Sequence, residues 1–386
     1  MQRNKVDFRE QRAESREQRF LYLDGMRGIA ALVVILYHYV VAYYPALYTG
    51  LIENVKTVSF IEIVVVNSPL NLFYDGDVAV CYFFILTGFL FRYRINDVNY
   101  CKITASIINR FFRLSIPVVV SLLLSYIVYK LGLYCNSMAA EISTSQWLGS
   151  FYKDNMTFIE LLKEMSLGMY YNYWMSYNPP LWTMYYEFYG IIIPLIARIC
   201  FRNVNKYVIY GILLLCTVNS YFFPFVLGAV IAENIGNNIC NRKKIILLLA
   251  GIMLASYPPA CNVTGTMYSL LFIPVIKNSG FFYHTIGMSL IMYITMQSNF
   301  IQQIFENKML LFIGKLSYSM YLIHFIILNS LSCYLWVYLL DKYSYIVSTG
   351  ITILVSYLVI ILLAKVNYIL IEQPISGIVG KLMKGK

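Results

Sequence analysis

The stretch "LDGMRGIAALVVILYHYV", residues 23 to 40, places Arg27 and His38 in one long apolar run. Eleven residues of α-helix rise about 16 Å over about three turns, so the two side chains share one helix face. An ionisable side chain inside a membrane span is costly and usually faces a polar cavity. The run therefore predicts a membrane helix with Arg27 at its cytoplasmic mouth and His38 beyond its midplane.

Composition extends this interpretation to the whole chain. Of 386 residues, 59% are hydrophobic and 13% are charged, whereas a soluble domain carries about a quarter charged residues. The apolar runs are continuous rather than alternating, which sets aside a membrane β-barrel. We predict an all-α fold, a polytopic integral membrane bundle of about ten transmembrane helices.

Basic residues set the expected topology. With the N-terminus in the cytoplasm, 24 of the 30 basic residues fall on the cytoplasmic side, which is the positive-inside pattern. This distribution explains the net charge of +11 without nucleic acid as a partner. The expected spans are 21–44, 74–91, 112–133, 181–199, 207–221, 222–239, 244–259, 281–303, 311–335 and 344–371. The stretch "TMYSLLFIPVI" within 244–303 could instead be a re-entrant piece or an extra span.

We expect three regions: a charged cytoplasmic tail over 1–20, a membrane domain over 21–375 and a basic cytoplasmic tail over 376–386. No cleavable signal peptide is expected, because the first apolar run is too long for one. The eight cysteines include no CxxC motif and no Cys/His cluster, so we expect no metal site. Cys135 and Cys261 fall on the predicted outer side and could pair.

The chemistry of the first span depends on its two ionisable groups. Arginine binds phosphate or carboxylate through its planar fork, and neutral histidine accepts a proton near physiological pH. Arg27 could equally be an anchor whose head reaches the headgroups. The pair suits a phosphate-bearing donor whose reactive end reaches a general base. Gly28 is small and lets a neighbouring helix or a ligand approach closely.

More arginines gather on the same predicted side. Arg92 and Arg94 end the second span, and Arg110 and Arg113 precede the third. Ordinary positive-inside charge explains each of them separately. Their convergence on the mouth that holds Arg27 makes a binding site for an anionic donor plausible.

The fourth span, "PPLWTMYYEFYGIIIPL", carries Glu187 about six residues from its outer end. His38 lies about as far from the outer end of its own span, so both groups are expected ~9 Å deep. Equal depth permits a Glu–His pair in which the carboxylate orients the imidazole. Trp182 is expected in the interfacial aromatic belt or beside the substrate.

The ninth span, "IGKLSYSMYLIHFIIL", places His324 near mid-membrane. Ser317 and Tyr321 are four residues apart and share a face, with Tyr318 beside them. This polar stripe could pack against another helix or support the site.

The last span ends in "LIEQPI". Glu372 is expected to pair with an arginine of the basic mouth, and Pro374 is expected to stop the helix. His284 lies near an outer span end and is interpreted as interfacial.

Six stretches resemble a known family when they are taken in their order from residue 23 to 374. They are "LDGMRGIAALVVILYH", "FFILTGFLFRYR", "FFRLSIP", "LWTMYYEFY", "GKLSYSMYLIH" and "IEQP". The chain resembles the acyltransferase-3 family of integral membrane acyltransferases, which includes bacterial O-antigen and exopolysaccharide O-acetylases. Thr183 and Thr87 stand where the family often has serine, and both keep a hydroxyl.

The resemblance implies transfer of an acyl group, commonly acetyl, from acyl-CoA to a hydroxyl of a lipid-linked or extracytoplasmic glycan. It implies ten spans and essential roles for Arg27, His38 and an arginine of the Arg92/Arg94 pair. We expect the CoA phosphates on Arg27, Arg92, Arg94 and Arg113. His38 is expected to be either the general base or the carrier of the acyl group.

Trp182, Tyr318, His324 and Glu372 are expected to support the substrate or the site. No metal cofactor is expected. The expected location is the bacterial inner membrane, with membrane lipid, a glycan acceptor and polysaccharide-assembly proteins as candidate partners.

Two other functions are consistent with the residues alone. His38, Glu187 and His324 could relay protons in a secondary transporter, although the inverted repeats typical of that class are not apparent. The chain could also be a scaffold in a polysaccharide-export complex, in which neither Arg27 nor His38 would have a chemical role.

Overall fold

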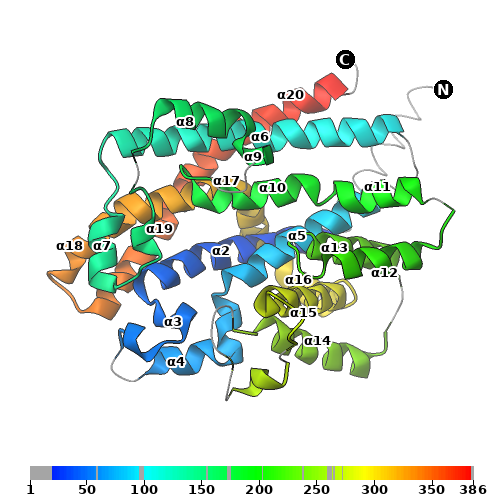
Figure 1. Cartoon of the computed structure of the whole chain (residues 1–386), viewed down its shortest axis with the longest axis horizontal. Helices are drawn as coiled ribbons and strands as arrows, with labels where there is room; N and C mark the ends of the chain where they lie inside the picture. Colours follow the sequence, from blue (N-terminus) through cyan, green and yellow to red (C-terminus); the bar gives the residue numbers. More distant parts are fainter. Residues whose placement is uncertain are drawn as a thin grey trace.

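The computed structural model describes a bundle in which every described element is a helix (Figure 1). The described residues are 20–57, 60–94, 100–153, 155–171, 175–201, 203–236, 239–258, 263, 266–271 and 273–383. The prediction of an all-α fold is confirmed for this part of the chain.

Five helical segments are long and apolar enough to cross a membrane, counted over the described residues. They belong to α2 (Leu21–Tyr43), α5 (Gly76–Arg94), α6 (Tyr100–Lys130), the run of α17 (Lys308–Ile327), η7 (Leu328–Ser332) and α18 (Cys333–Leu340), and the run of α19 (Tyr345–Asn367), η8 (Tyr368–Glu372) and α20 (Gln373–Met383). These helices, together with the composition, make the chain a membrane protein.

The predicted count of ten spans is not confirmed, because the helices between α6 and α17 are shorter than expected. They are α10 (Trp182–Tyr189), α11 (Ile192–Cys200), α12 (Lys206–Thr217), α13 (Phe223–Glu233), α14 (Asn241–Ala255), α15 (Ser279–Thr295) and α16 (Asn299–Phe305). A helix of 12 residues such as α12 is about 18 Å long, which is less than the ~30 Å hydrocarbon core. Among its described residues, the stretch "TMYSLLFIPVI" forms one short 3₁₀ helix, η6 (Met267–Leu271).

Short helices fill the two long connections that the sequence places on the outer side. The first contains α3 (Ala46–Thr49), η1 (Ile52–Asn54), α4 (Ile61–Val66) and η2 (Pro69–Phe73). The second contains α7 (Asn136–Ser143), η3 (Leu148–Ser150), α8 (Phe158–Lys163), η4 (Glu164–Gly168), α9 (Met169–Tyr171) and η5 (Pro179–Leu181). Figure 1 shows α3, α4 and α7 near the same end of α2.

The centre of the bundle is the pair α2 and α17, which pack along one another. Their backbones come so close that a Cβ atom on Gly28 would lie 2.5 Å from the carbonyl oxygen of Leu310, and one on Gly314 would collide with the carbonyl of Asp24. Small residues at both faces make this approach possible, as the sequence predicts for Gly28.

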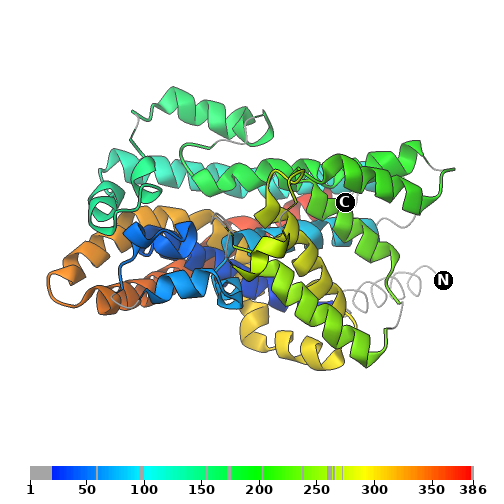
Figure 2. The same ribbon diagram turned by 60° about the horizontal axis from the view of Figure 1, so that its bottom comes forward.

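A second close pair joins α5 to α13, where Gly88 and Gly228 each face the other helix's backbone. On the far side of the bundle from α6, α14 packs against α15 (Figure 2). α20 returns along α6. The helix α5 therefore lies between the α2–α17 pair and the α13–α15 group.

The sequence predictions for Pro374 and for the Cys135–Cys261 pair have different outcomes. Pro374 does not stop the last helix, because the π-helical turn η8 leads directly into α20 and the chain stays helical to Met383. Pro374 lies directly after the π-helical turn within this continuous run, so its missing amide hydrogen interrupts the helical hydrogen bonding locally without ending the helix. Cys261 lies outside the described residues, so its proposed pairing with Cys135 stays a prediction.

We predict that Gly28→Val destabilises the fold by about 1–3 kcal/mol, because the added side chain would force α2 away from α17. The matched control is Gly350→Val, since nothing lies within 4 Å of a Cβ at Gly350 on α19. Thermal unfolding of both purified variants in the same detergent measures the difference. Equal midpoints would contradict the close α2–α17 contact.

Candidate functional site

Two histidines meet where α2 and α17 run side by side. His38 Nδ1 lies 3.0 Å from His324 Nε2, and the ring centroids are 5.0 Å apart. His324 is fully buried. The two residues are 286 positions apart in the chain, and the helix pairing alone brings them together.

The hydrogen bonds of the pair fix which nitrogen carries each proton. His324 Nδ1 lies 2.7 Å from the carbonyl oxygen of Tyr321, and because a carbonyl only accepts, Nδ1–H is the donor. In the neutral ring His324 Nε2 is then an acceptor, so His38 Nδ1–H donates to it. The lone pair is then on His38 Nε2, for which the described part of the chain supplies no hydrogen-bond partner.

Aromatic rings enclose the His38 imidazole. Trp147 stacks on it with centroids 5.5 Å apart and an interplanar angle of 14°. Phe325 and Tyr37 pack edge-on at 5.6 Å and 5.4 Å. Trp147 comes from the connection between α7 and η3, so that segment covers the histidine pair.

Arg27 lies on the same face of α2, eleven residues before His38. Its guanidinium donates to Asp24 Oδ1 at 3.1 Å and to Ser317 Oγ at 3.3 Å. Ser317 and His324 both belong to α17, which therefore runs parallel to α2 beside both ionisable groups. The expectation that Arg27 and His38 share one face inside the bundle matches this arrangement.

Glu187 pairs with a different partner from the one its depth suggested. Its carboxylate accepts hydrogen bonds from Arg110 and, at 3.0 Å, from Thr87 Oγ1, and its backbone carbonyl also accepts from Arg110. The described contacts of His38 include none with Glu187. Equal depth in the membrane does not determine which helices are neighbours. Because α10 lies beside α6, the Glu187 carboxylate meets Arg110 rather than His38.

An arginine cluster lies between α2, α5 and α6. Arg113 is within electrostatic range of Arg27, Arg94, Arg110 and Glu372. Arg94 and Arg113 are exposed, and neither forms an ion pair with another described residue. We call Arg27, Arg94, Arg110 and Arg113 the arginine cluster.

Glu372 lies beside this cluster, close to Arg27 and Arg113, and accepts a hydrogen bond from Ser319 Oγ at 2.9 Å. The predicted ion pair with an arginine is not found among the described residues, because the carboxylate is bonded to Ser319 instead.

Arg92 differs from its neighbours because it is already paired. Its guanidinium lies 2.6 Å from Glu233 on α13, and the Lys206 ammonium lies 2.8 Å from the same carboxylate. This three-residue network joins α5, α12 and α13. The prediction that Arg92 binds a donor phosphate stays a prediction, and the pairing supports a role in helix packing.

The remaining expected support residues also form contacts within the bundle. Trp182 packs against Tyr186 and Tyr221, and the Tyr318 hydroxyl donates to the carbonyl of Leu114 at 2.8 Å. Tyr318 thus links α17 to α6, next to the arginine cluster.

The family model described as an acyltransferase domain matches residues 20–365. The chain belongs to the acyltransferase-3 family. It is 21% identical to "Acyltransferase clz18" from Cochliobolus lunatus, over 94% of this chain and 95% of that protein. No solved structure matches it.

Acyltransferase-3 membership makes the chain an acyltransferase of the membrane. Thr87 and Thr183, the two threonines at positions where serine was expected, each use the side-chain hydroxyl in a contact. Thr87 Oγ1 donates to Glu187, and Thr183 Oγ1 lies 2.7 Å from the Tyr321 hydroxyl. Both positions use their hydroxyl in a contact between helices, which explains why threonine is compatible there.

One cluster of polar side chains in this acyltransferase was not predicted from the sequence. Asp75, Asp77 and His284 cluster at the start of α5. His284 is fully buried rather than interfacial, because α15 packs its face against α5. No spacing motif signals the cluster, since His284 lies more than 200 residues after Asp75.

We predict that Glu187→Ala destabilises the protein by about 3–5 kcal/mol, because Arg110 would remain as an uncompensated charge. The double variant Glu187→Ala with Arg110→Ala should lose less stability than the sum of the two single variants. A double-mutant cycle of thermal or denaturant unfolding measures this coupling. Strict additivity would contradict the ion pair.

Proposed function

We propose that the chain is a membrane-embedded O-acyltransferase that moves an acyl group, most simply acetyl, from cytoplasmic acyl-CoA to a hydroxyl of a cell-surface or lipid-linked glycan. Family membership supports acyl transfer. The observation that carries the proposed chemistry is the His38–His324 pair at 3.0 Å, and the arginine cluster includes Arg27 on the same helix as His38.

His38 Nε2 is the proposed general base. It takes the proton of the acceptor hydroxyl while the hydroxyl oxygen attacks the thioester carbonyl. The carbon–sulfur bond then breaks, and the sulfur leaves with a proton as the CoA thiol. General-base catalysis of this kind contributes about 10²- to 10⁴-fold in rate.

His324 is the proposed positioning residue. In a serine protease triad a carboxylate holds the imidazole in its working tautomer. Here the neutral His324 ring accepts from His38 Nδ1–H, and the Tyr321 carbonyl holds the His324 ring in turn. This assignment replaces the role that equal depth suggested for Glu187.

The arginine cluster is the proposed site for the CoA phosphates. Arg27 and His38 are eleven residues apart on α2, which is about 16 Å along the axis. An extended pantetheine arm can bridge a distance of this order. Of the four arginines that were expected to bind CoA, Arg27, Arg94 and Arg113 remain the candidates. Among the described residues, Arg27 forms an ion pair only with the exposed Asp24 side chain, whereas Arg92 is held by the buried Glu233.

The direct experiment uses the purified protein in liposomes with acetyl-CoA, longer acyl-CoA donors and a panel of glycan and lipid-linked acceptors. Release of the CoA thiol and mass analysis of the acceptor measure transfer. Uptake of substrate without any thiol release would instead favour the transporter. A bacterial inner-membrane location and cytoplasmic termini are part of the proposal, and protease protection of tagged termini tests the orientation.

We predict that His38→Ala lowers kcat by about 10²- to 10⁴-fold, because the proton acceptor is removed. His324→Ala should lower kcat while leaving the KM for acyl-CoA unchanged, and His324→Gln should recover part of the loss, since its amide oxygen can accept from His38 Nδ1–H. The control is Ile29→Ala, an exposed position on the same helix. Full activity in folded His38→Ala protein would contradict the assignment.

We predict that Arg113→Ala raises the KM for acetyl-CoA about 10- to 100-fold, because a hydrogen bond to a charged group contributes about 1.5–3 kcal/mol. The same variant should use acetyl-pantetheine, which lacks the nucleotide phosphates, as well as the unaltered protein does. Steady-state kinetics at two salt concentrations give the comparison. A KM that rises equally for both donors would argue against phosphate binding.

A further inference from the structure

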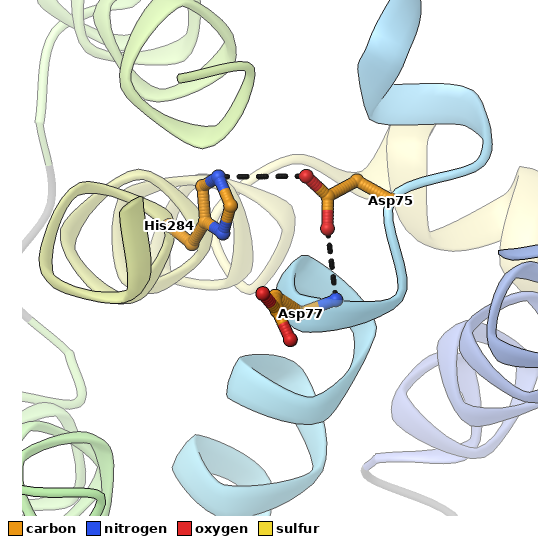
Figure 3. Close-up of side chains that lie close together, drawn as sticks. All are labelled: Asp75, Asp77 and His284. Atoms are coloured by element: carbon orange, nitrogen blue, oxygen red, sulfur yellow. Dashed lines mark hydrogen bonds and ion pairs between the residues drawn. The ribbon is translucent and has the colours of Figure 1, made fainter. Parts of the chain in front are cut away.

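A second polar cluster lies away from the histidine pair, where the α5 helix begins. Asp75 precedes the helix, Asp77 is in its first turn, and His284 comes from α15. One potential ligand atom from each of these residues lies within 4.8 Å of the other two. Figure 3 shows the Asp75 carboxylate facing the imidazole, with Asp77 beside them.

The cluster is shielded from solvent. Asp75 is 1% exposed and His284 is fully buried, while Asp77 is partly exposed. Asp75 Oδ1 accepts from the Asp77 amide at 2.8 Å, whereas Oδ2 has no hydrogen-bond partner among the described residues and lies 3.6 Å from His284 Nε2. A buried carboxylate oxygen without a partner is costly and calls for a missing ligand.

The imidazole is oriented as a ligand. His284 Nε2 lies 2.5 Å from the carbonyl oxygen of Tyr257, so Nε2–H is the donor and Nδ1 of the neutral ring carries the lone pair. Nδ1 is buried, has no hydrogen-bond partner in the part of the chain that the structure describes, and lies on the side of the ring nearer Asp77 in Figure 3. Metal-bound histidines commonly donate their second N–H to a backbone carbonyl in this way.

The negative charge of the two aspartates also favours a bound cation. Over the described residues, no lysine or arginine forms an ion pair with Asp75 or Asp77, and the one ion-pair contact of Asp75 is with His284 at 3.6 Å. A buried carboxylate beside a second, partly exposed one is destabilising when no cation balances the charge. A divalent cation bound between them would balance their charge while the histidine stays neutral.

We propose that Asp75, Asp77 and His284 bind a divalent transition metal ion, with Zn²⁺ the best match. Zinc accepts carboxylate oxygen and imidazole nitrogen in four-coordinate sites, whereas Ca²⁺ takes 6–8 oxygen ligands and Mg²⁺ keeps several waters. Two ligands on a tetrahedral zinc ion lie about 3.3 Å apart.

The metal would join the start of α5 to α15 and to the Tyr257 segment. Gly76, between the two aspartates, packs against the ring of Tyr37, and Tyr37 precedes His38. The ion would therefore fix the helix end that supports the wall of the histidine site. This role is structural and does not depend on the identity of the acyl donor or acceptor.

The test uses tag-free full-length protein in detergent, passed through a chelating resin and then titrated with ZnCl₂. We expect about one zinc ion per chain by plasma mass spectrometry after desalting, and a thermal midpoint that rises with added Zn²⁺. Asp77→Asn and His284→Gln should lose both effects. The control Glu53→Gln removes an exposed carboxylate in η1 and should behave like the unaltered protein.

The metal titration of the unaltered protein keeps the proposal testable even if a cluster variant fails to fold. Absence of stoichiometric zinc together with no Zn²⁺-dependent midpoint would overturn it. Retention of zinc by both folded cluster variants would also overturn it, as would a midpoint that responds to CaCl₂ and not to ZnCl₂.

Discussion

The backbone-to-backbone contact between α2 and α17 determines the geometry on which the rest of this acyltransferase depends. In a membrane, apolar side chains gain little by leaving lipid for protein, so close packing and buried polar contacts hold helices together. Glycines at this crossing allow the two helices to run in parallel at short distance. The same contact places Arg27 beside Ser317 and His38 beside His324.

Other polar contacts are arranged around that pair in separate groups. Glu187 joins α10 to α5 and α6 through Thr87 and Arg110, and Glu233 joins α13 to Arg92 and Lys206. Each carboxylate neutralises a partly buried arginine whose charge would destabilise the fold if it had no partner. Within the arginine cluster, the described residues provide no such partner for the exposed Arg94 and Arg113, which leaves positive charge available at one mouth of the bundle.

Local patterns in the sequence predict much of this fold. The apolar run from residue 21 gives α2 nearly to the residue, and helical periodicity places Arg27 and His38 on one face. Properties that require knowledge of which helices touch could not be predicted. Equal depth suggested Glu187 as the partner of His38, but His324, 286 residues away in sequence, is the neighbour that the packing provides. Likewise, residues 181–199 form two short helices, because the chain breaks at Gly190 and Ile191.

The histidine pair has a consequence for how the protein responds to the voltage across its membrane. A carboxylate in the place of His324 would leave a fixed negative charge within the field, where each elementary charge that crosses 100 mV corresponds to about 2.3 kcal/mol. Two neutral imidazoles joined by one hydrogen bond carry no net charge at rest. If the pair is the proposed reaction centre, its uncharged resting form does not respond to the electrical potential, and only the protonated form of His38 would experience it.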